Sequence, residues 1–324
     1  MIKISLTDEK RDNINKKYWE LIKNHTQIIN SFTDKGGRKE LKKYNYKLEK
    51  FLYNKNKFCE DKLKELVTAD KQKMLHYIKE FEIGEMLKED TKHASQNLIN
   101  NFFKYSVISR KEGFYDILKD LNVSVCPYCN RQYTFTIKSQ NAKNIRPFLD
   151  HYYPKSKYPF LAISIWNLIP CCSSCNLLKS DKDTVTYPIL YPYEKKVGED
   201  INFDIERSKE SDFVKFIYGL EDTFEVIIDE STLSQESKNH INLLRLIDFY
   251  NEHKTYIQNI IKKNYINSED YINNLYQSYP QLFNTIDDVK NLIYMTDIEK
   301  ENWIHNPLSK LTSDVLAFLD RKKI

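Results

Sequence analysis

The chain has 324 residues, of which 41% are hydrophobic, so it is long enough for two or three packed units with buried cores. Its 50 basic and 46 acidic residues leave a net charge of only +4, which excludes a molecule-wide basic field, so any nucleic-acid surface must be local. No apolar leader follows MIKISLTDEK, and no run of about 18 uncharged apolar residues occurs, so we expect a cytoplasmic protein with no membrane partner.

Residues 1–120 are predicted to form a helical region. Apolar residues such as Ile14, Tyr18 and Leu21 recur at three- and four-residue steps, which is the period of a helix with one buried face. Within the region, TDKGGRKE (33–40) is predicted to be a loop because it contains paired glycines. The region is large enough to bind a partner protein or DNA.

A strongly basic stretch, residues 35–57, lies inside this helical region. It holds nine lysines and arginines but only two acidic residues, and three tyrosines are interleaved with them. Such a stretch fits contacts with nucleic-acid phosphates, with Lys42 and Lys43 among the predicted contacts. A solvated helix face with buried tyrosines would have the same composition and is equally compatible with this segment, so both interpretations stay open.

Residues 121–190 change character and are predicted to form a compact module braced by zinc. Two C-x2-C knuckles supply four cysteines, and clustered cysteines in a reducing compartment indicate metal binding before disulfides. A structural zinc site takes four such ligands in a tetrahedron. The predicted ligands are Cys126, Cys129, Cys172 and Cys175. A shifted second pair that uses Cys171 stays open, although only Cys172 and Cys175 have the x2 spacing.

Residues 191–324 are predicted to begin with short strands and to continue as helices. INFDIE, DFVKFIYG and DTFEVIIDE are rich in β-branched and aromatic residues, which favours strands. Helical periodicity returns from about Ser234, and NPLSKLTSDVLAFLDRKK is typical of a last helix that begins at Ser309 or Thr312. The chain as a whole is therefore predicted to be α+β and mainly helical.

Three polar residues near the knuckles are candidates for catalysis and metal binding. Asp150 and His151 follow the strand-like segment RPFL, and Asn176 follows the second knuckle directly. Hydrolysis of a phosphodiester needs an activated water and a cation that neutralises the phosphate. At a strand's end Asp150 can reach a cation while His151 reaches a water, and an imidazole with an unperturbed pKa of about 6.5 accepts a proton at cellular pH. An amide oxygen from Asn176 completes a donor set that suits Mg2+.

The segments LDHYYPKS and WNLIPCCSSCNLLKSD together resemble the HNH, or ββα-metal, nuclease motif flanked by zinc knuckles. The resemblance covers residues 123–185. His151 matches the first motif histidine, Asn167 the central asparagine, and Asn176 the third position, where the family often has histidine.

The resemblance implies a role for each motif residue. His151 is expected to be the general base, and Asn167 to orient the loop that carries it. Asp150 and Asn176 are expected to hold Mg2+, with Mn2+ as an alternative. Lys179 and Lys155 are predicted to contact the nucleic acid. The fold that follows is a central ββα-metal module between helical regions.

The same two segments are similar to the HNH proteins of bacterial antiphage systems, namely the PtuB component of Septu and its retron-associated relatives. The similarity implies a metal-dependent endonuclease, acting on DNA, that serves antiviral defence with a PtuA-like ATPase partner resembling ABC and SMC heads. A non-catalytic, zinc-braced adaptor that binds nucleic acid or protein is the alternative.

Overall fold

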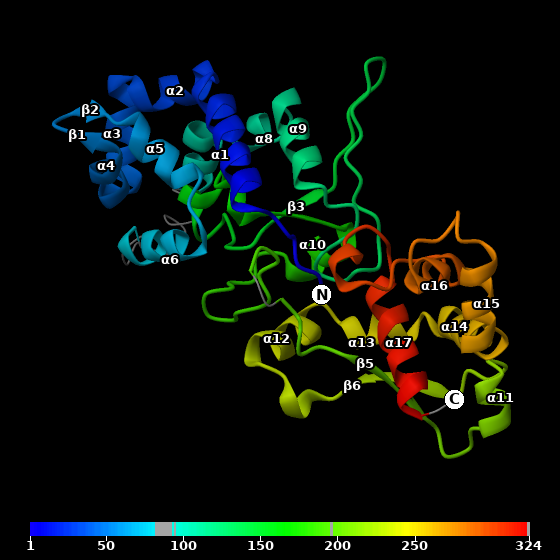
Figure 1. Cartoon of the computed structure of the whole chain (residues 1–324). Helices are drawn as coiled ribbons and strands as arrows, with labels where there is room; N and C mark the ends of the chain where they lie inside the picture. Colours follow the sequence, from blue (N-terminus) through cyan, green and yellow to red (C-terminus); the bar gives the residue numbers. More distant parts are fainter. Residues whose placement is uncertain (82–92, 94, 195–196, 323–324) are drawn as a thin grey trace. The chain divides into compact units, whose positions relative to one another are not determined.

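The computed structural model describes residues 1–81, 93, 95–194 and 197–322 (Figure 1). The chain divides into two compact units. We call Leu6–Val123 with Thr134–Tyr187 the amino-terminal unit, and Met1–Ser5 with Ser124–Tyr133 and Pro188–Ile324 the carboxy-terminal unit. Helices dominate the described residues, and the strands form three separate two-stranded antiparallel sheets. The prediction of a mainly helical α+β chain is confirmed at this level, whereas the predicted division at residues 120 and 190 stays a prediction.

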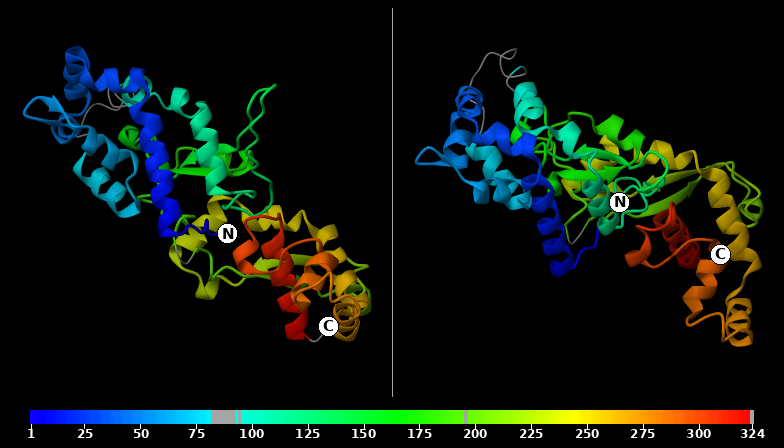
Figure 2. Two further views of the ribbon diagram at one scale, coloured as in Figure 1. Left: turned by 45° about the horizontal axis from the view of Figure 1, so that its top comes forward. Right: turned by 90° about the horizontal axis from the view of Figure 1, so that it is seen from above.

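The amino-terminal unit begins with a long amphipathic helix, α1 (Asp8–Lys23). Thr7 caps it by accepting a hydrogen bond from the Lys10 amide at 3.2 Å. Its buried face packs against α9 (Figure 1; Figure 2), and Tyr18 donates a hydrogen bond to the Ile163 carbonyl at 2.6 Å. The elements of the unit before residue 122 are α1, α2 (Thr26–Thr33), α3 (Lys35–Tyr44), α4 (Tyr46–Leu52), β1 (Tyr53–Asn54), β2 (Lys57–Phe58), α5 (Glu60–Val67), α6 (Lys71–Glu80), the π-helix η1 (Leu98–Phe103), α8 (Tyr105–Ile108) and α9 (Glu112–Leu121).

The predicted loop at 33–40 is wrong. Only Asp34 separates α2 from α3, and both glycines of the segment lie inside α3. A Cβ atom on Gly37 would lie 2.1 Å from the Ser31 carbonyl oxygen. The glycine therefore allows two consecutive helices to approach closely, and it does not mark a flexible connection.

The segment that carries the predicted site residues forms two strands and a helix. β3 (Phe148–His151) pairs with β4 (Leu168–Cys171), so that Asp150 lies opposite Ile169 and His151 opposite Leu168. α10 (Ser173–Lys179) follows β4 after one residue and packs against β3. The connection between the strands contains two 3-10 turns, η2 (Pro159–Leu161) and η3 (Ile165–Asn167).

The connection between β3 and β4 is anchored inside the amino-terminal unit. The Trp166 indole donates a hydrogen bond to Asn15 at 2.9 Å, and the Ser164 hydroxyl donates one to the Leu66 carbonyl at 2.8 Å. Trp166 and Ser164 are both buried. Residues from α1 and α5 thus hold the loop that follows His151, which gives the end of β3 a rigid surrounding.

The carboxy-terminal unit pairs one sheet with a set of helices. Two of its three predicted strands are confirmed, since β5 (Phe203–Arg207) overlaps INFDIE (201–206) and ends one residue beyond it, and DTFEVIIDE contains β6 (Phe224–Ile228). The predicted strand DFVKFIYG is wrong. It forms α11 (Phe213–Ile217), because the Asp212 carboxylate accepts hydrogen bonds from two amides of the first turn.

The remaining helices of the unit follow in sequence. They are η4 (Glu230–Thr232), α12 (Gln235–Leu243), α13 (Leu246–Asn251), α14 (Lys254–Ile266), α15 (Glu269–Ser278), α16 (Ile286–Tyr294), η5 (Lys300–Asn302) and α17 (Ser309–Lys322). The last helix begins at Ser309, one of the two predicted starts, and packs against β5 and α14. Among the described residues, no helix combines the length and apolar character needed to cross a bilayer.

Candidate functional site

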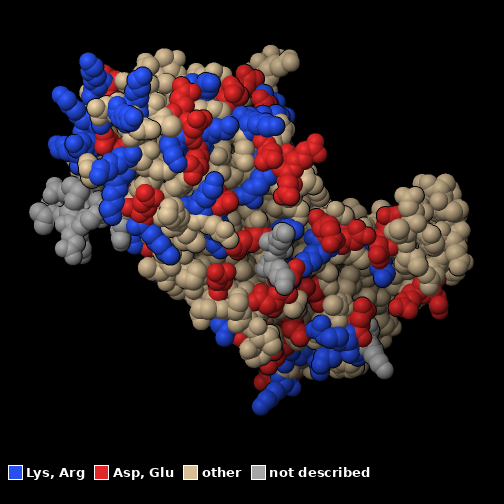
Figure 3. Space-filling view, turned by 60° about the vertical axis from the view of Figure 1, so that its left-hand side comes forward, with Lys and Arg blue, Asp and Glu red and all other residues tan. Residues whose placement is uncertain are grey.

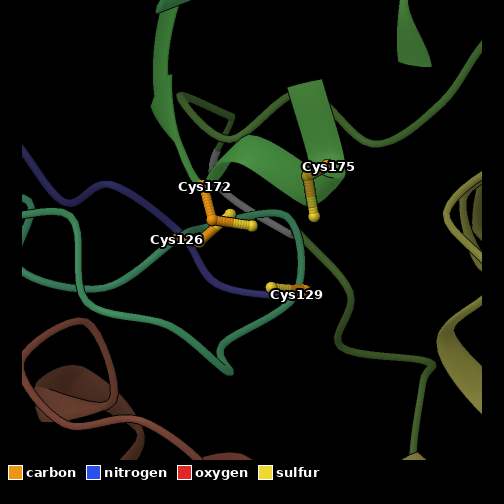
Figure 4. A group of neighbouring side chains, drawn as sticks. All are labelled: Cys126, Cys129, Cys172 and Cys175. Carbon is orange, nitrogen blue, oxygen red and sulfur yellow. The ribbon is translucent and has the colours of Figure 1, made fainter. Parts of the chain in front are cut away.

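Four cysteine side chains gather around one point (Figure 4). The sulfurs of Cys126, Cys129, Cys172 and Cys175 all lie within 4.8 Å of one another, and all four residues are buried. Four thiolates at about 2.3 Å from a central zinc ion stand about 3.8 Å apart, so this set fits a tetrahedral zinc site. The cluster uses Cys172 and leaves Cys171 out, which settles the register of the second knuckle.

The first knuckle is a tight turn with its own supports. The Asn130 amide donates to the Cys126 carbonyl at 2.8 Å, and Asn130 adopts a left-handed φ of 50° that turns the chain. Tyr250 donates to the Cys129 carbonyl at 2.5 Å, and the His240 ring bonds the Tyr128 carbonyl at 2.8 Å. These side chains fix the backbone that presents both sulfurs.

The second knuckle stands at the start of α10. Cys172 is the N-cap residue, and its carbonyl accepts a hydrogen bond from the Asn176 amide at 3.0 Å. Amide dipoles at a helix N-terminus stabilise negative charge, so the position favours the thiolate form that binds zinc. The same turn of helix places Asn176 directly beyond the knuckle.

A cavity of about 350 Å3 brings predicted site residues together in the amino-terminal unit. Asp150 and His151 enter it from the end of β3, Asn176 from α10, and Lys155 from the loop after β3. The other lining residues are Leu149, Pro154, Ser156, Leu177, Ser180 and Asp181. Residues 26 positions apart along the chain thus share one cavity because β3 and α10 pack together.

The His151 imidazole is held as a neutral base. Its Nε2 lies 2.9 Å from the Ala162 carbonyl oxygen, which can only accept, so Nε2 carries the proton and the lone pair stays on Nδ1. Burial lowers the pKa of His151 to about 3, and the nearby charge of Lys155 contributes to this shift. At neutral pH the ring is therefore uncharged, and Nδ1 keeps its lone pair.

Asp150 and Lys179 form a buried ion pair. Asp150 Oδ1 lies 3.2 Å from Lys179 Nζ, and the exposed fractions of the two side chains are 3% and 0%. The ammonium also donates to the His151 carbonyl oxygen at 2.7 Å. In this conformation Lys179 braces the end of β3 from α10, and its predicted contact with a nucleic-acid phosphate stays a prediction.

Asn167 clamps the loop that follows β3. Its side-chain nitrogen donates to the carbonyls of Tyr153 and Leu161 at 3.0 and 3.1 Å, and its side-chain oxygen accepts from the Tyr153 amide at 2.8 Å. The residue is fully buried. Asn167 thus ties Tyr153 to Leu161 within this loop but does not line the cavity, and its role in orienting the loop beside His151 stays a prediction.

Tyr105 is a neighbour of the site that the sequence does not mark. Its ring meets the His151 ring edge-on, with centroids 4.6 Å apart, and the Lys155 ammonium lies 4.6 Å from its centroid. Burial raises the pKa of Tyr105 to about 12, so the phenol stays protonated. Tyr105 lies on α8, 46 positions before His151, and no spacing rule connects the two.

The predicted nucleic-acid contacts Lys42 and Lys43 lie elsewhere in the amino-terminal unit. Both are exposed on α3 and neither lines the cavity. The Lys42 ammonium lies 5.6 Å from the centroid of the Tyr46 ring, and the Lys43 ammonium lies 6.0 Å from that of Tyr44. The structure thus separates the predicted surface contacts from the predicted catalytic residues.

The cavity combines the Asp150 carboxylate, the Asn176 side-chain amide and the neutral His151 imidazole. Oxygen donors of this kind suit Mg2+, and a neutral imidazole beside them can take a proton from a water molecule. Comparisons with family models, with curated proteins and with solved structures find no match for this chain. The geometry of the cavity and the cysteine cluster therefore carry the functional argument.

Proposed function

We propose that this protein is a metal-dependent endonuclease of the HNH type that hydrolyses phosphodiester bonds, with DNA as its substrate. One observation carries the proposal. A buried imidazole, fixed as a neutral base by the Ala162 carbonyl, lines the same cavity as Asp150 and Asn176. The order β3, β4, α10 with a cysteine cluster at the helix start supports the ββα-metal interpretation.

Asp150 and Asn176 would hold the catalytic cation. Both residues line the cavity, and both offer the hard oxygen ligands that Mg2+ and Mn2+ take. When bound there, the cation would neutralise charge on the phosphate and on the leaving oxygen. The four cysteines would hold a zinc ion that braces the fold, because a set of four buried thiolates leaves no open position for a substrate.

The remaining steps, which are proton transfer and positioning, fall to side chains of the protein. His151 accepts a proton from the attacking water at Nδ1, since Nε2 is already committed to the Ala162 carbonyl. Asn167 keeps the adjoining loop in place through three hydrogen bonds, and Lys155 brings a positive charge to the cavity wall. A fixed base needs no reorganisation at the moment of reaction.

The biological setting is part of the same proposal. Its support is the similarity of the segments around Asp150 and Asn176 to the HNH proteins of Septu and retron-associated antiphage systems. On that basis the protein would be a defence effector that acts with an ATPase partner resembling ABC and SMC heads.

Cleavage of plasmid DNA in Mg2+, with and without EDTA, tests the proposal. His151→Ala should lower the rate about 10²- to 10⁴-fold while zinc content and folding stay unchanged. His76→Ala is the matched control, because His76 is exposed and its ion pair is with Glu80 on its own helix. Equal cleavage by wild type and His151→Ala would exclude this mechanism and favour an adaptor. The assay should be repeated with RNA and with the ATPase present.

A further inference from the structure

The face formed by α3 and α4 is rich in exposed lysines. Six exposed lysines lie on these two helices, and none of them has an ion-pair partner within the part of the chain that the structure describes: Lys35, Lys39, Lys42, Lys43, Lys47 and Lys50. Among the described residues, the ion pair that these helices do form joins Arg38 to Glu49 at 2.6 Å, and Glu49 is buried. The view that brings this side of the molecule forward shows basic side chains gathered at its upper left (Figure 3).

One tyrosine on this face is exposed between two of the lysines. Tyr46 is 48% exposed, with the Lys50 ammonium 4.6 Å and the Lys42 ammonium 5.6 Å from its ring centroid. Tyr53, by contrast, is buried and donates to the Phe32 carbonyl. Leu48 and Leu52 are the buried apolar residues of α4, so Tyr46 is not needed for the core.

We propose that Tyr46, Lys42 and Lys50 form a binding site for a single-stranded segment of nucleic acid, in which an unpaired base stacks on the tyrosine and the lysines contact the flanking phosphates. The inference rests on the proposed nuclease function and names the substrate class that this surface receives. An exposed aromatic ring among cations is the arrangement that sequence-tolerant single-strand binding uses.

The lysines above the ring do not block such a base. An exposed cation–π contact favours its geometry only about 2- to 5-fold, whereas a base stacked on an aromatic side chain contributes about 5- to 150-fold in affinity. Stacking therefore displaces a lysine, whose long side chain then reaches a phosphate. The lysine thus exchanges its contact with the ring for a contact with a phosphate, and the ring gains a contact with the base.

The tyrosine distinguishes a single strand from a duplex. Bases in a duplex are already stacked on one another, so binding of a duplex depends on phosphate contacts and gains nothing from Tyr46. An unpaired base has a free face for the ring. Loss of the ring should therefore weaken the binding of single strands and leave duplex binding nearly unchanged.

Fluorescence anisotropy on the full chain tests the inference, in buffer without Mg2+, with a labelled oligothymidylate of about 20 nucleotides and a DNA duplex of about the same length. All proteins carry His151→Ala, so that cleavage does not interfere. Tyr46→Ala should weaken oligothymidylate binding about 5- to 100-fold, and Tyr46→Phe should retain it. Tyr271→Ala is the matched control, because Tyr271 is 49% exposed on α15 in the other unit.

A second variant examines the lysines. The pair Lys42→Gln and Lys50→Gln should reduce the slope of log affinity against log salt by about 0.7 for each lysine that binds a phosphate in the wild type. Oligothymidylate binding that is unaffected by Tyr46→Ala, or an equal weakening on the duplex, would overturn the inference. Neither result would bear on the nuclease proposal, which is tested separately by Mg2+-dependent cleavage and by the loss of that cleavage in His151→Ala.

Discussion

The Asp150 carboxylate and the Lys179 ammonium meet 3.2 Å apart with almost no solvent contact, and they join the end of β3 to the end of α10. The ammonium also holds the His151 backbone. Burying two charges is costly, and the cost is recovered only while both partners are present. The pair therefore couples the position of the proposed base to α10, the helix at whose start the second pair of clustered cysteines lies.

Lys179→Met should destabilise the fold by about 3–5 kcal/mol, because it leaves the buried Asp150 carboxylate without its counter-ion. Urea unfolding at neutral pH measures the change. Lys119→Met, at an exposed position on α9, should change stability by less than about 0.5 kcal/mol. The double variant Lys179→Met with Asp150→Leu should recover part of the stability, and a double variant as unstable as the single one would argue against the coupling.

Metal analysis of the purified protein should find about one zinc ion per chain. Cys129→Ser and Cys175→Ser should lose the zinc and become sensitive to proteases, because metal binding and folding are linked in such sites. Cys171→Ser should keep both metal and fold, since Cys171 lies outside the cluster. A well-folded, zinc-free Cys129→Ser, Cys175→Ser protein would contradict a structural role for the metal.

Asp150 and Asn176 are expected to set the cation requirement. Asp150→Ala also leaves the buried Lys179 ammonium unpaired, so its folding is checked first. The folded variant should cleave more slowly in Mg2+, and excess Mn2+ should restore part of the activity because Mn2+ binds nitrogen and oxygen ligands more strongly than Mg2+ does. Asn176→His should shift the metal preference towards softer ions without destroying the cavity. Rate measurements across a series of Mg2+ and Mn2+ concentrations separate weakened metal binding from impaired chemistry, and an unchanged Mg2+ dependence in Asp150→Ala would remove Asp150 from the site.

Tyr105 should act as a positioning residue for His151. Tyr105→Leu removes the edge-on ring contact and the platform for Lys155, so kcat should fall about 10-fold with little change in KM. Tyr105→Phe keeps the ring and should restore kcat, whereas Tyr271→Leu should have no effect. A change in KM alone, or failure of the phenylalanine variant to rescue, would speak against positioning.

Acid should destabilise the fold through His240. Burial lowers the pKa of His240 to about 3 in the folded state, and its Nδ1 is buried with no hydrogen-bond partner among the described residues. The unfolded chain takes up a proton near pH 6.5, so the stabilisation is complete above that pH and is lost as the pH falls towards 3. His240 alone should account for a decrease of about 2 kcal/mol in the free energy of unfolding at pH 5.

The variant His240→Gln can keep a hydrogen bond to the Tyr128 carbonyl but cannot titrate. Its unfolding free energy should therefore vary less between pH 7.5 and pH 5 than that of the wild type, with zinc content checked at each pH. His76→Gln, at an exposed site, should leave the wild-type dependence in place. A pH dependence unchanged by His240→Gln would mean that other groups cause the acid sensitivity.

Local features of the sequence determined much of the framework. The x2 spacing of Cys172 and Cys175 identified the right pair, because a knuckle is a single turn whose geometry depends only on its own residues. The β-branched and aromatic residues of β5 and β6 likewise predicted two strands. The exceptions are also local in origin, since the capping carboxylate of Asp212 converts a strand-like segment into α11.

Packing between distant segments decided what the sequence left open. Of the tyrosines in the basic stretch, Tyr53 is buried and Tyr46 is exposed, although both stand among lysines in the sequence. Lys179 is buried because α10 packs against β3, and Tyr105 on α8 meets His151 at the end of the same strand. Periodicity reports which side of one element is apolar, but it carries no information about which other element covers that side. The neighbours of the proposed base therefore emerge only from the tertiary structure.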